Sequence, residues 1–216
     1  MKLKHTLSIA LGGYTINLIV NLLCTFFFNG EMYQIVYRAY TNNSSYTFSC
    51  NNISTLFYIF LFLGCIFFIT SLLKMKKNIK LQPLATITAV LFGISLAYNL
   101  MLQLWHLSAI LGGKSEVNVY FWSFGFNGIM SWIDWLAHLG LLIMFACMKN
   151  LMPMTRIIAV VACLLPILHL VVGLFGVNVY APLISQTYFI VNGMLWCTML
   201  LLLCMNSDLL GESASR

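Results

Sequence analysis

Asn127–His138 reads NGIMSWIDWLAH and continues without a break into the apolar segment Leu139–Ala146, LGLLIMFA. Four polar residues recur at intervals of four, three and four positions: Asn127, Ser131, Asp134 and His138. On an α-helix this spacing places them on one face. A carboxylate in the middle of a bilayer costs about 2.5–3.5 kcal/mol on insertion scales, so such a face points into a bundle or a wet cavity. The stretch therefore predicts a helix bundle with a polar interior, in which His138 is the local partner of Asp134.

The composition places most of the chain in an apolar environment. Of its 216 residues 61% are hydrophobic and 7% are charged, and the mean hydropathy is +0.93. A helix needs about 20 apolar residues to cross a bilayer. Six such runs are present: Leu7–Phe28, Ile53–Leu73, Pro83–Ile110, Gly128–Met148, Arg156–Phe175 and Pro182–Met205. The sequence predicts an all-α, multi-pass integral membrane protein with one six-helix domain over residues 1–216, including a short disordered tail over residues 206–216.

Basic residues are distributed unevenly between the two ends of these runs. Those at the end that carries the termini are Lys2, Lys4, Lys74, Lys76, Lys77, Lys80, Lys149, Arg156 and Arg216. Only Arg38 and Lys114 lie at the opposite end. Because basic residues flank the cytoplasmic ends of spans, we expect both termini to be cytoplasmic, in a plasma, inner or internal membrane. This asymmetry explains the net charge of +6, which gives no indication of nucleic-acid binding.

Two segments outside the runs are expected at the outer surface. Asn29–Asn52 is the longest connection, is rich in Asn, Ser, Thr and Tyr, and is predicted as a loop. Its Asn-x-Ser sequences, at Asn42, Asn43 and Asn52, would accept glycans only in a eukaryotic secretory host, and Asn52 lies too near the membrane to be a good acceptor. Val119–Phe126 is aromatic and contains a glycine, which is typical of a strip in the headgroup region and also compatible with a lid over a cavity.

The third run carries a second polar face. Its members are spaced four, four and three residues apart: Ser95, Asn99, Gln103 and His106. If the two polar faces meet, they line a cavity in the outer half of the bundle, with His138 deeper than His106. Taken alone, His106 is more simply an interfacial histidine beside Trp105. In the fifth run, Pro166 frees a backbone carbonyl and kinks the helix near His169. The candidate cavity-lining residues are therefore Ser131, Asn127, Asn99, Gln103, His106 and His169.

The pair of Asp134 and His138 is compatible with several kinds of chemistry. It could relay protons in a carrier, although the repeats and broken helices of transporters are not visible. It supplies only two ligands of a metal site, and the seven cysteines show no CxxC or zinc spacing, so no metal or cofactor is expected. In hydrolysis His138 would be the general base. Its nucleophile would have to come from another helix, because Ser131 lies two turns, or about 10 Å, away.

The pattern Trp132-Ile-Asp134-x-x-x-His138 resembles the Trp-Leu-Asn-x-x-x-His element of the androgen-induced-gene family. Members of that family are six-span hydrolases that cleave fatty acid esters of hydroxy fatty acids. Thr86–Leu100 is similar to the third helix of the family, and His169–Leu183 resembles the turn before its last helix. Asp134 stands where the family has Asn, and Ala181 interrupts the Tyr-Pro pair of that turn.

The resemblance implies a Thr or Ser nucleophile paired with His138, a lipid-ester substrate and no cofactor. Phe48-Ser49 resembles a bacterial Phe-Thr element, but Thr55 lies closer to the expected depth of His138 and is preferred. The first prediction is thus an integral membrane lipid-ester hydrolase. In it Thr55 or Ser49 attacks the ester carbonyl, His138 removes the proton, and Asp134 fixes the histidine tautomer.

Two further interpretations stay open. One is a non-catalytic carrier or binding protein whose polar intrabilayer cavity holds a headgroup, ion or proton. The other is a scaffold in which the polar faces only lock helices together. A Thr55 or Ser49 oxygen close to a His138 nitrogen inside a pocket would support the enzyme, whereas polar faces paired without a void would support the scaffold.

Overall fold

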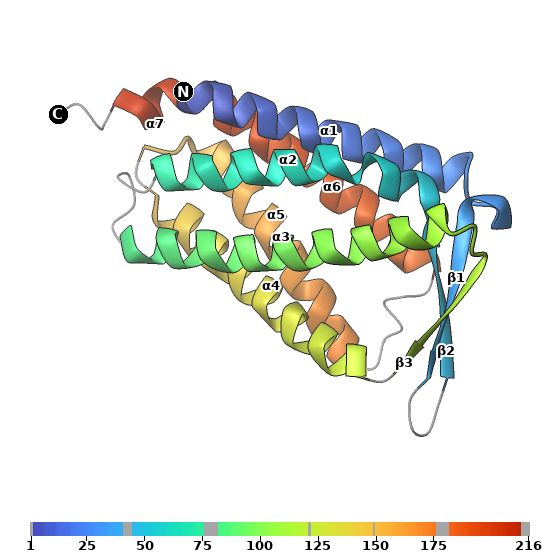
Figure 1. Cartoon of the computed structure of the whole chain (residues 1–216). Coiled ribbons are helices and arrows are strands. Elements are labelled where there is room, and N and C mark those ends of the chain that lie inside the picture. Colours follow the sequence, from blue (N-terminus) through green and yellow to red (C-terminus); the bar gives the residue numbers. More distant parts are fainter. Residues whose placement is uncertain are drawn as a thin grey trace.

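The computed structural model describes residues 2–40, 45–75, 82–120, 122–148, 150–175 and 182–212. Its elements, in chain order, are α1 (Leu3–Phe26), the short 3-10 helix η1 (Glu31–Tyr33), β1 (Gln34–Tyr40), β2 (Ser45–Asn51), α2 (Asn52–Met75), α3 (Gln82–Leu111), β3 (Glu116–Tyr120), α4 (Trp122–Cys147), α5 (Pro153–Leu174), α6 (Pro182–Met205) and α7 (Ser207–Glu212). Within these residues, six helices, α1 to α6, are long and apolar enough to cross a membrane. Each coincides with one of the apolar runs, which confirms the six predicted long apolar helices (Figure 1).

The six long helices form a closed ring in chain order. Each packs against the next one, and α6 returns to pack against α1. In Figure 1 the axes of α1, α2 and α3 are nearly aligned, while α4 crosses α3 obliquely. The two termini lie at the same end of the ring, and the strands lie at the other. At the end that carries the termini the connections between consecutive helices are short, which favours packing of those helices as antiparallel neighbours. At the other end the connections after α1 and α3 contain the strands.

Small residues bring α1 and α2 into close contact. Gly13 and Gly64 are buried against each other, and a Cβ atom on Gly13 would lie 2.8 Å from the Cα atom of Gly64 and nearer still to the carbonyl oxygen of Phe60. About two turns away, the Ser71 hydroxyl donates a 2.7 Å hydrogen bond to the Thr6 hydroxyl, and both side chains are fully buried. Helices in membranes pack by such close approach and by hydrogen bonds, because lipid supplies little hydrophobic driving force between them.

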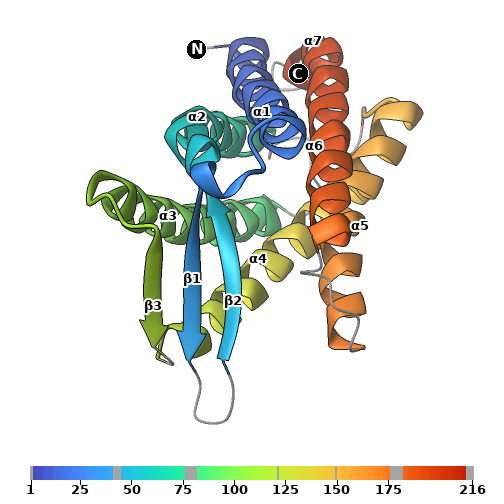
Figure 2. The ribbon, with the colours of Figure 1, turned by 90° about the vertical axis from the view of Figure 1, so that its right-hand side faces the viewer.

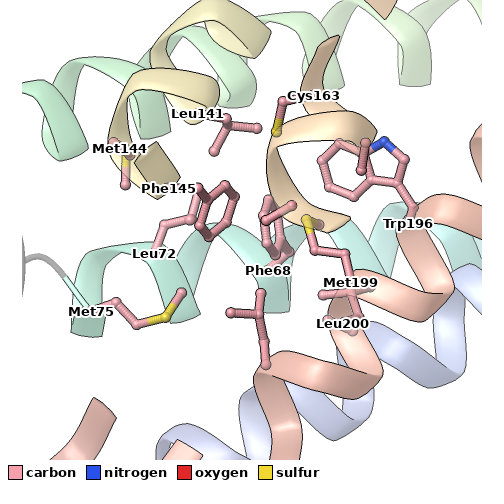
Figure 3. Packing of buried hydrophobic residues seen from close by; sticks show 14 of the residues in the cluster. Phe68, Leu72, Met75, Leu141, Met144, Phe145, Cys163, Trp196, Met199 and Leu200 are labelled. Carbon is pink, nitrogen blue, oxygen red and sulfur yellow. The ribbon is translucent and has the colours of Figure 1, made fainter. Parts of the chain in front are cut away.

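Large apolar side chains fill the end of the ring nearer the termini. Figure 3 shows rings from α2, α4 and α6 turned toward one another, with Cys163 of α5 beside them. Fully buried members of this core include Phe68, Leu72, Met75, Leu141, Met144, Phe145, Met199 and Leu200. This dense packing contrasts with the polar side chains found further along α3 and α4.

The predicted outer loop Asn29–Asn52 is wrong, because most of it forms part of a three-stranded sheet. Strand β1 pairs antiparallel with β2 and parallel with β3, in the order β2-β1-β3. Ile35 and Tyr37 point inward and are 1% exposed, whereas Val36 between them is exposed, as expected of a half-buried strand. The sheet lies at the ends of α1, α2 and α3 (Figure 2), so the fold is not purely all-α. The expected aromatic strip is divided: Val119 and Tyr120 end β3, and Trp122 begins α4.

The predicted disordered tail is wrong for Ser207–Glu212, which forms α7. This helix is held because Leu210 is buried and because the amide of the buried residue Asn206 donates to the hydroxyl of Thr155 in α5.

Of the basic residues used to predict sidedness, those in the described ranges are Lys2, Lys4, Lys74 and Arg156 near the termini and Arg38 and Lys114 near the sheet. Lys76, Lys77, Lys80, Lys149 and Arg216 lie outside the described residues, as do Asn42 and Asn43.

We expect Gly13→Ala to destabilise the protein by about 1–3 kcal/mol, because the added methyl group overpacks the contact between α1 and α2. The matched control is Gly12→Ala, since a Cβ atom there meets nothing within 4 Å and alanine is favoured over glycine in a helix. Thermal unfolding of both variants in detergent provides the measurement. Equal midpoints for the two variants would show that α1 and α2 do not approach at Gly13.

Candidate binding cavity

A cavity of about 210 Å³ lies between α3, α4, α5 and α6. Its wall is formed by Ser95, Tyr98, Asn99, Met130, Ser131, Asp134, Trp135, Pro166, His169, Leu170 and Tyr188. The predicted lining residues Ser131, Asn99 and His169 are therefore brought together around Asp134. Pro166 lies in the same wall, at the position where the sequence predicted a distortion of the fifth helix.

Asp134 is the acidic group of this cavity. It lies near the middle of α4, and 43% of its side-chain surface is exposed. Its Oδ1 atom accepts a 2.7 Å hydrogen bond from the hydroxyl of Ser95, which lies near the middle of α3. The side-chain amide of Asn99 donates to the carbonyl oxygen of Ser95, 3.0 Å away, and so supports this serine. The two polar faces predicted from the sequence thus meet at Ser95 and Asp134, with a void beside them.

His138 lies one turn from Asp134 but in a different environment. Its Nδ1 atom is 2.8 Å from the carbonyl oxygen of Asp134 and 3.4 Å from the carboxylate Oδ2. A carbonyl oxygen only accepts hydrogen bonds, so Nδ1 carries the proton in this contact, and Nε2 is the basic nitrogen of the neutral ring. The side chain is 9% exposed and is absent from the cavity wall. His138 is therefore a neighbour of Asp134, as expected. Its shorter contact is with the backbone carbonyl oxygen of Asp134 and not with the carboxylate.

Aromatic rings surround His138. One of them belongs to Trp196 of α6, which was not singled out from the sequence. Its indole lies edge to face with the imidazole, at 5.9 Å between ring centroids, and is stacked on Tyr14 at 5.2 Å. Phe92 also meets the imidazole edge to face, at 5.8 Å, and Phe68 lies edge to face with the indole. Because these rings come from four other helices, only the closed ring assembles the environment of His138.

The predicted nucleophiles are engaged elsewhere. The Thr55 hydroxyl donates a 2.8 Å hydrogen bond to the side-chain oxygen of Gln103, which joins α2 to α3. Ser49 is exposed on strand β2, where it pairs with Val36. Across the described part of the chain, neither Thr55 nor Ser49 makes a hydrogen bond with His138. The Thr/Ser–His pair that the family resemblance implies is thus not formed in this structure.

Two other predicted lining residues lie away from the cavity. Gln103 is bonded to Thr55, as described, and His106 is 4% exposed beneath the sheet, where its Nδ1 atom is hydrogen-bonded to the hydroxyl of Tyr37. Burial raises the pKa of Tyr37 to about 12, so this phenol keeps its proton at neutral pH. His106 therefore anchors the sheet on α3. Asn127 is a position of α4 whose side chain lies outside the described part of the chain.

The aromatic side of the cavity was missed by sequence reasoning. Tyr98, Trp135 and Tyr188 belong to it, and the ring of Tyr188 is stacked on that of His169 with centroids 3.8 Å apart. Trp135 adjoins Asp134 in the opening motif, and Tyr98 precedes Asn99, so a helical-face plot would have placed both near the polar face. Tyr188 had a similar signal, since Ser185, Tyr188 and Asn192 are spaced three and four residues apart in the last span and share a helical face.

The described residues contain no group of three or more His, Cys, Asp or Glu side chains that could hold a metal ion. No family model matches the chain, and neither do the curated proteins or the solved structures compared with it. The functional inference therefore depends on the geometry around Asp134.

We expect Ser95→Ala to destabilise the protein by about 1–3 kcal/mol, because it removes the hydrogen bond to a carboxylate inside an apolar bundle. Ser108→Ala is the matched control: Ser108 is exposed on the same helix and bonds only to the carbonyl oxygen of Trp105. Unfolding in detergent at neutral pH, followed by tryptophan fluorescence, compares the two. If both variants unfold like the wild type, Ser95 does not support Asp134.

Proposed function

We propose that the chain is an integral membrane protein that binds a polar group of a membrane ligand in the Asp134 cavity, as a binding protein or carrier rather than as an enzyme. The observation that carries this proposal is the hydrogen bond from Ser95 to Asp134 at the wall of a void halfway along the helices. A carboxylate at this depth is costly unless it serves a ligand or a polar pathway. Membrane proteins with such intrabilayer groups commonly use them in binding or transport.

The order of the three groups at this site argues against nucleophilic hydrolysis. The hydroxyl of Ser95 and the imidazole of His138 both contact Asp134, so the carboxylate stands between them. In a serine hydrolase the imidazole stands between the hydroxyl and the carboxylate, because it must remove the hydroxyl proton. Here that proton is directed at the carboxylate. The site therefore holds a charge in place, and no activated nucleophile results.

The proposed orientation has both termini in the cytoplasm. It is supported by Lys2, Lys4, Lys74 and Arg156 at the end that carries the termini, against Arg38 and Lys114 at the sheet end. On this assignment the sheet faces the outer side of a plasma, inner or internal membrane.

Filling the cavity should displace its ligand. We expect wild-type protein, purified in a mild detergent and extracted with organic solvent, to release a bound lipid or other amphiphile detected by mass spectrometry. Ser131→Phe should retain several-fold less, because the ring occupies the void beside Asp134.

The matched control is Ile129→Phe, which adds a ring to an exposed position of the same helix and should retain the wild-type amount. Both variants are compared as monodisperse protein. Equal retention in wild type and Ser131→Phe, or no retained ligand in the wild type, would contradict the proposed binding function.

A second candidate is the lipid-ester hydrolase implied by the resemblance of α4 to the androgen-induced-gene family. The observation that favours it is the contact between His138 Nδ1 and the Asp134 carbonyl oxygen, which leaves Nε2 as a base. It also requires Thr55 to leave Gln103 and reach His138.

We expect purified wild type and His138→Ala to show the same background cleavage of a fatty acid ester of a hydroxy fatty acid, since among the described residues Thr55 is bonded to Gln103 and Ser49 is exposed on β2, away from His138. Release of free fatty acid over time provides the measurement, with Thr55→Ala as a third sample. Cleavage that is at least about tenfold faster in the wild type than in both variants would overturn the binding proposal and establish the hydrolase.

A further inference from the structure

We infer that the ligand of the cavity carries an organic ammonium group, bound by the Asp134 carboxylate and by the aromatic rings of Tyr98, Trp135 and Tyr188. This inference rests on the proposed binding function and specifies its ligand class. Three observations support it: the unbalanced charge of the cavity, the chemistry of its wall, and its size.

The charge of the cavity is negative. The chain has five acidic residues, and Asp134 is the one that lies inside the six apolar runs. The cavity wall contains neither lysine nor arginine. The basic side chain in the wall is His169, whose ring is stacked on that of Tyr188. His138 lies outside the wall, with Nδ1 2.8 Å from the backbone carbonyl oxygen of Asp134 and 3.4 Å from its carboxylate Oδ2. The Asp134 carboxylate is half-exposed toward this cavity, in the middle of an apolar helix, and a cationic ligand would supply a positive partner there.

Aromatic side chains make up much of the remaining wall. Tyr98, Trp135 and Tyr188 come from three different helices, and the Tyr188 ring is fixed by stacking on His169. The faces of such rings attract cations, and sites for quaternary ammonium groups are typically aromatic cages, often with a carboxylate. An inorganic cation would instead require about six oxygen ligands at short range, which this partly aromatic wall does not provide.

The size of the cavity limits the ligand. A volume of about 210 Å³ is smaller than the pockets that enclose drug-sized molecules. It accommodates an ammonium group with a short polar extension, and any acyl chains would have to remain outside. The same chemistry is found in the choline or ethanolamine headgroup of a lipid and in a free small amine, so the experiment must separate these two sources.

Choline and its neutral carbon isostere, 3,3-dimethylbutan-1-ol, test the inference directly because they share a shape and differ in charge. The full-length protein is placed in nanodiscs of phosphatidylglycerol, which contain no ammonium group, and binding is measured by titration calorimetry. We expect saturable choline binding and binding of the isostere that is at least about tenfold weaker. This comparison uses the wild type alone, so it does not depend on the folding of a variant.

Variants then assign the charge to Asp134. Asp134→Asn should weaken choline binding by about tenfold or more, and Asp134→Glu should retain much of it, because the glutamate keeps the charge. Asp208→Asn, which removes an exposed acid of α7, should bind choline like the wild type. Repeating the titration in phosphatidylcholine nanodiscs separates the sources: loss of choline binding there identifies a lipid headgroup, and unchanged binding identifies a free amine.

Equal binding of choline and its isostere, unchanged binding by Asp134→Asn, or displacement of choline by equimolar sodium would overturn the ammonium assignment. The proposed function can survive that result. If the wild type retains an amphiphile that Ser131→Phe loses, while choline and its isostere bind alike, only the ligand class is wrong. If no amphiphile is retained and neither probe binds, both proposals fail.

Discussion

The carboxylate of Asp134 sets the central constraint on this structure, since it lies within a helix that is otherwise suited to lipid. Its desolvation cost is offset by the hydroxyl of Ser95 and by the space beside it, which admits a polar partner. Both features require α3 and α4 to meet at their midpoints while α5 and α6 stay far enough away to leave a void. The oblique course of α4 and the proline within α5 fit that requirement.

One turn of α4 separates two different environments. Asp134 faces the cavity, whereas His138 is enclosed by Phe92 and Trp196 and belongs to the aromatic core. The contact between Asp134 and His138 therefore lies at the boundary between a polar void and a packed interior. A histidine in that position can orient the carboxylate and respond to its charge without touching the ligand, which is a positioning role rather than a catalytic one.

The sequence predicted the six spans and the meeting of two polar faces, because hydropathy and helical spacing are local properties of the chain. It could not show which residues pair across helices. Thr55 was expected near His138 from its depth along the helix alone. The order of the helices around the ring instead places α2 beside α3, where the Thr55 hydroxyl donates to Gln103. Depth along a helix is readable from sequence, whereas rotation about the helix axis depends on packing against neighbours.

The sheet was missed for a related reason. Strand β1 has only a short alternating pattern, and its parallel partner β3 begins at Glu116, far along the chain and after two spans. Pairing over such a distance leaves no local signal. The same pairing brings Tyr37 onto His106, so a histidine that was expected at the mouth of the cavity became the anchor of the sheet.

Ligand binding at Asp134 requires that polar molecules reach the void beside its carboxylate. Modification of an engineered cysteine by the small cationic reagent methanethiosulfonate ethylammonium tests this most directly, with labelling at each site read by peptide mass spectrometry. Ser131→Cys places the thiol in the cavity wall, and Ala137→Cys places it at a fully buried position of the same helix. We predict rapid labelling at position 131 and none at position 137. Absence of labelling at position 131 in folded protein would show that the cavity is closed to polar molecules and would contradict the account.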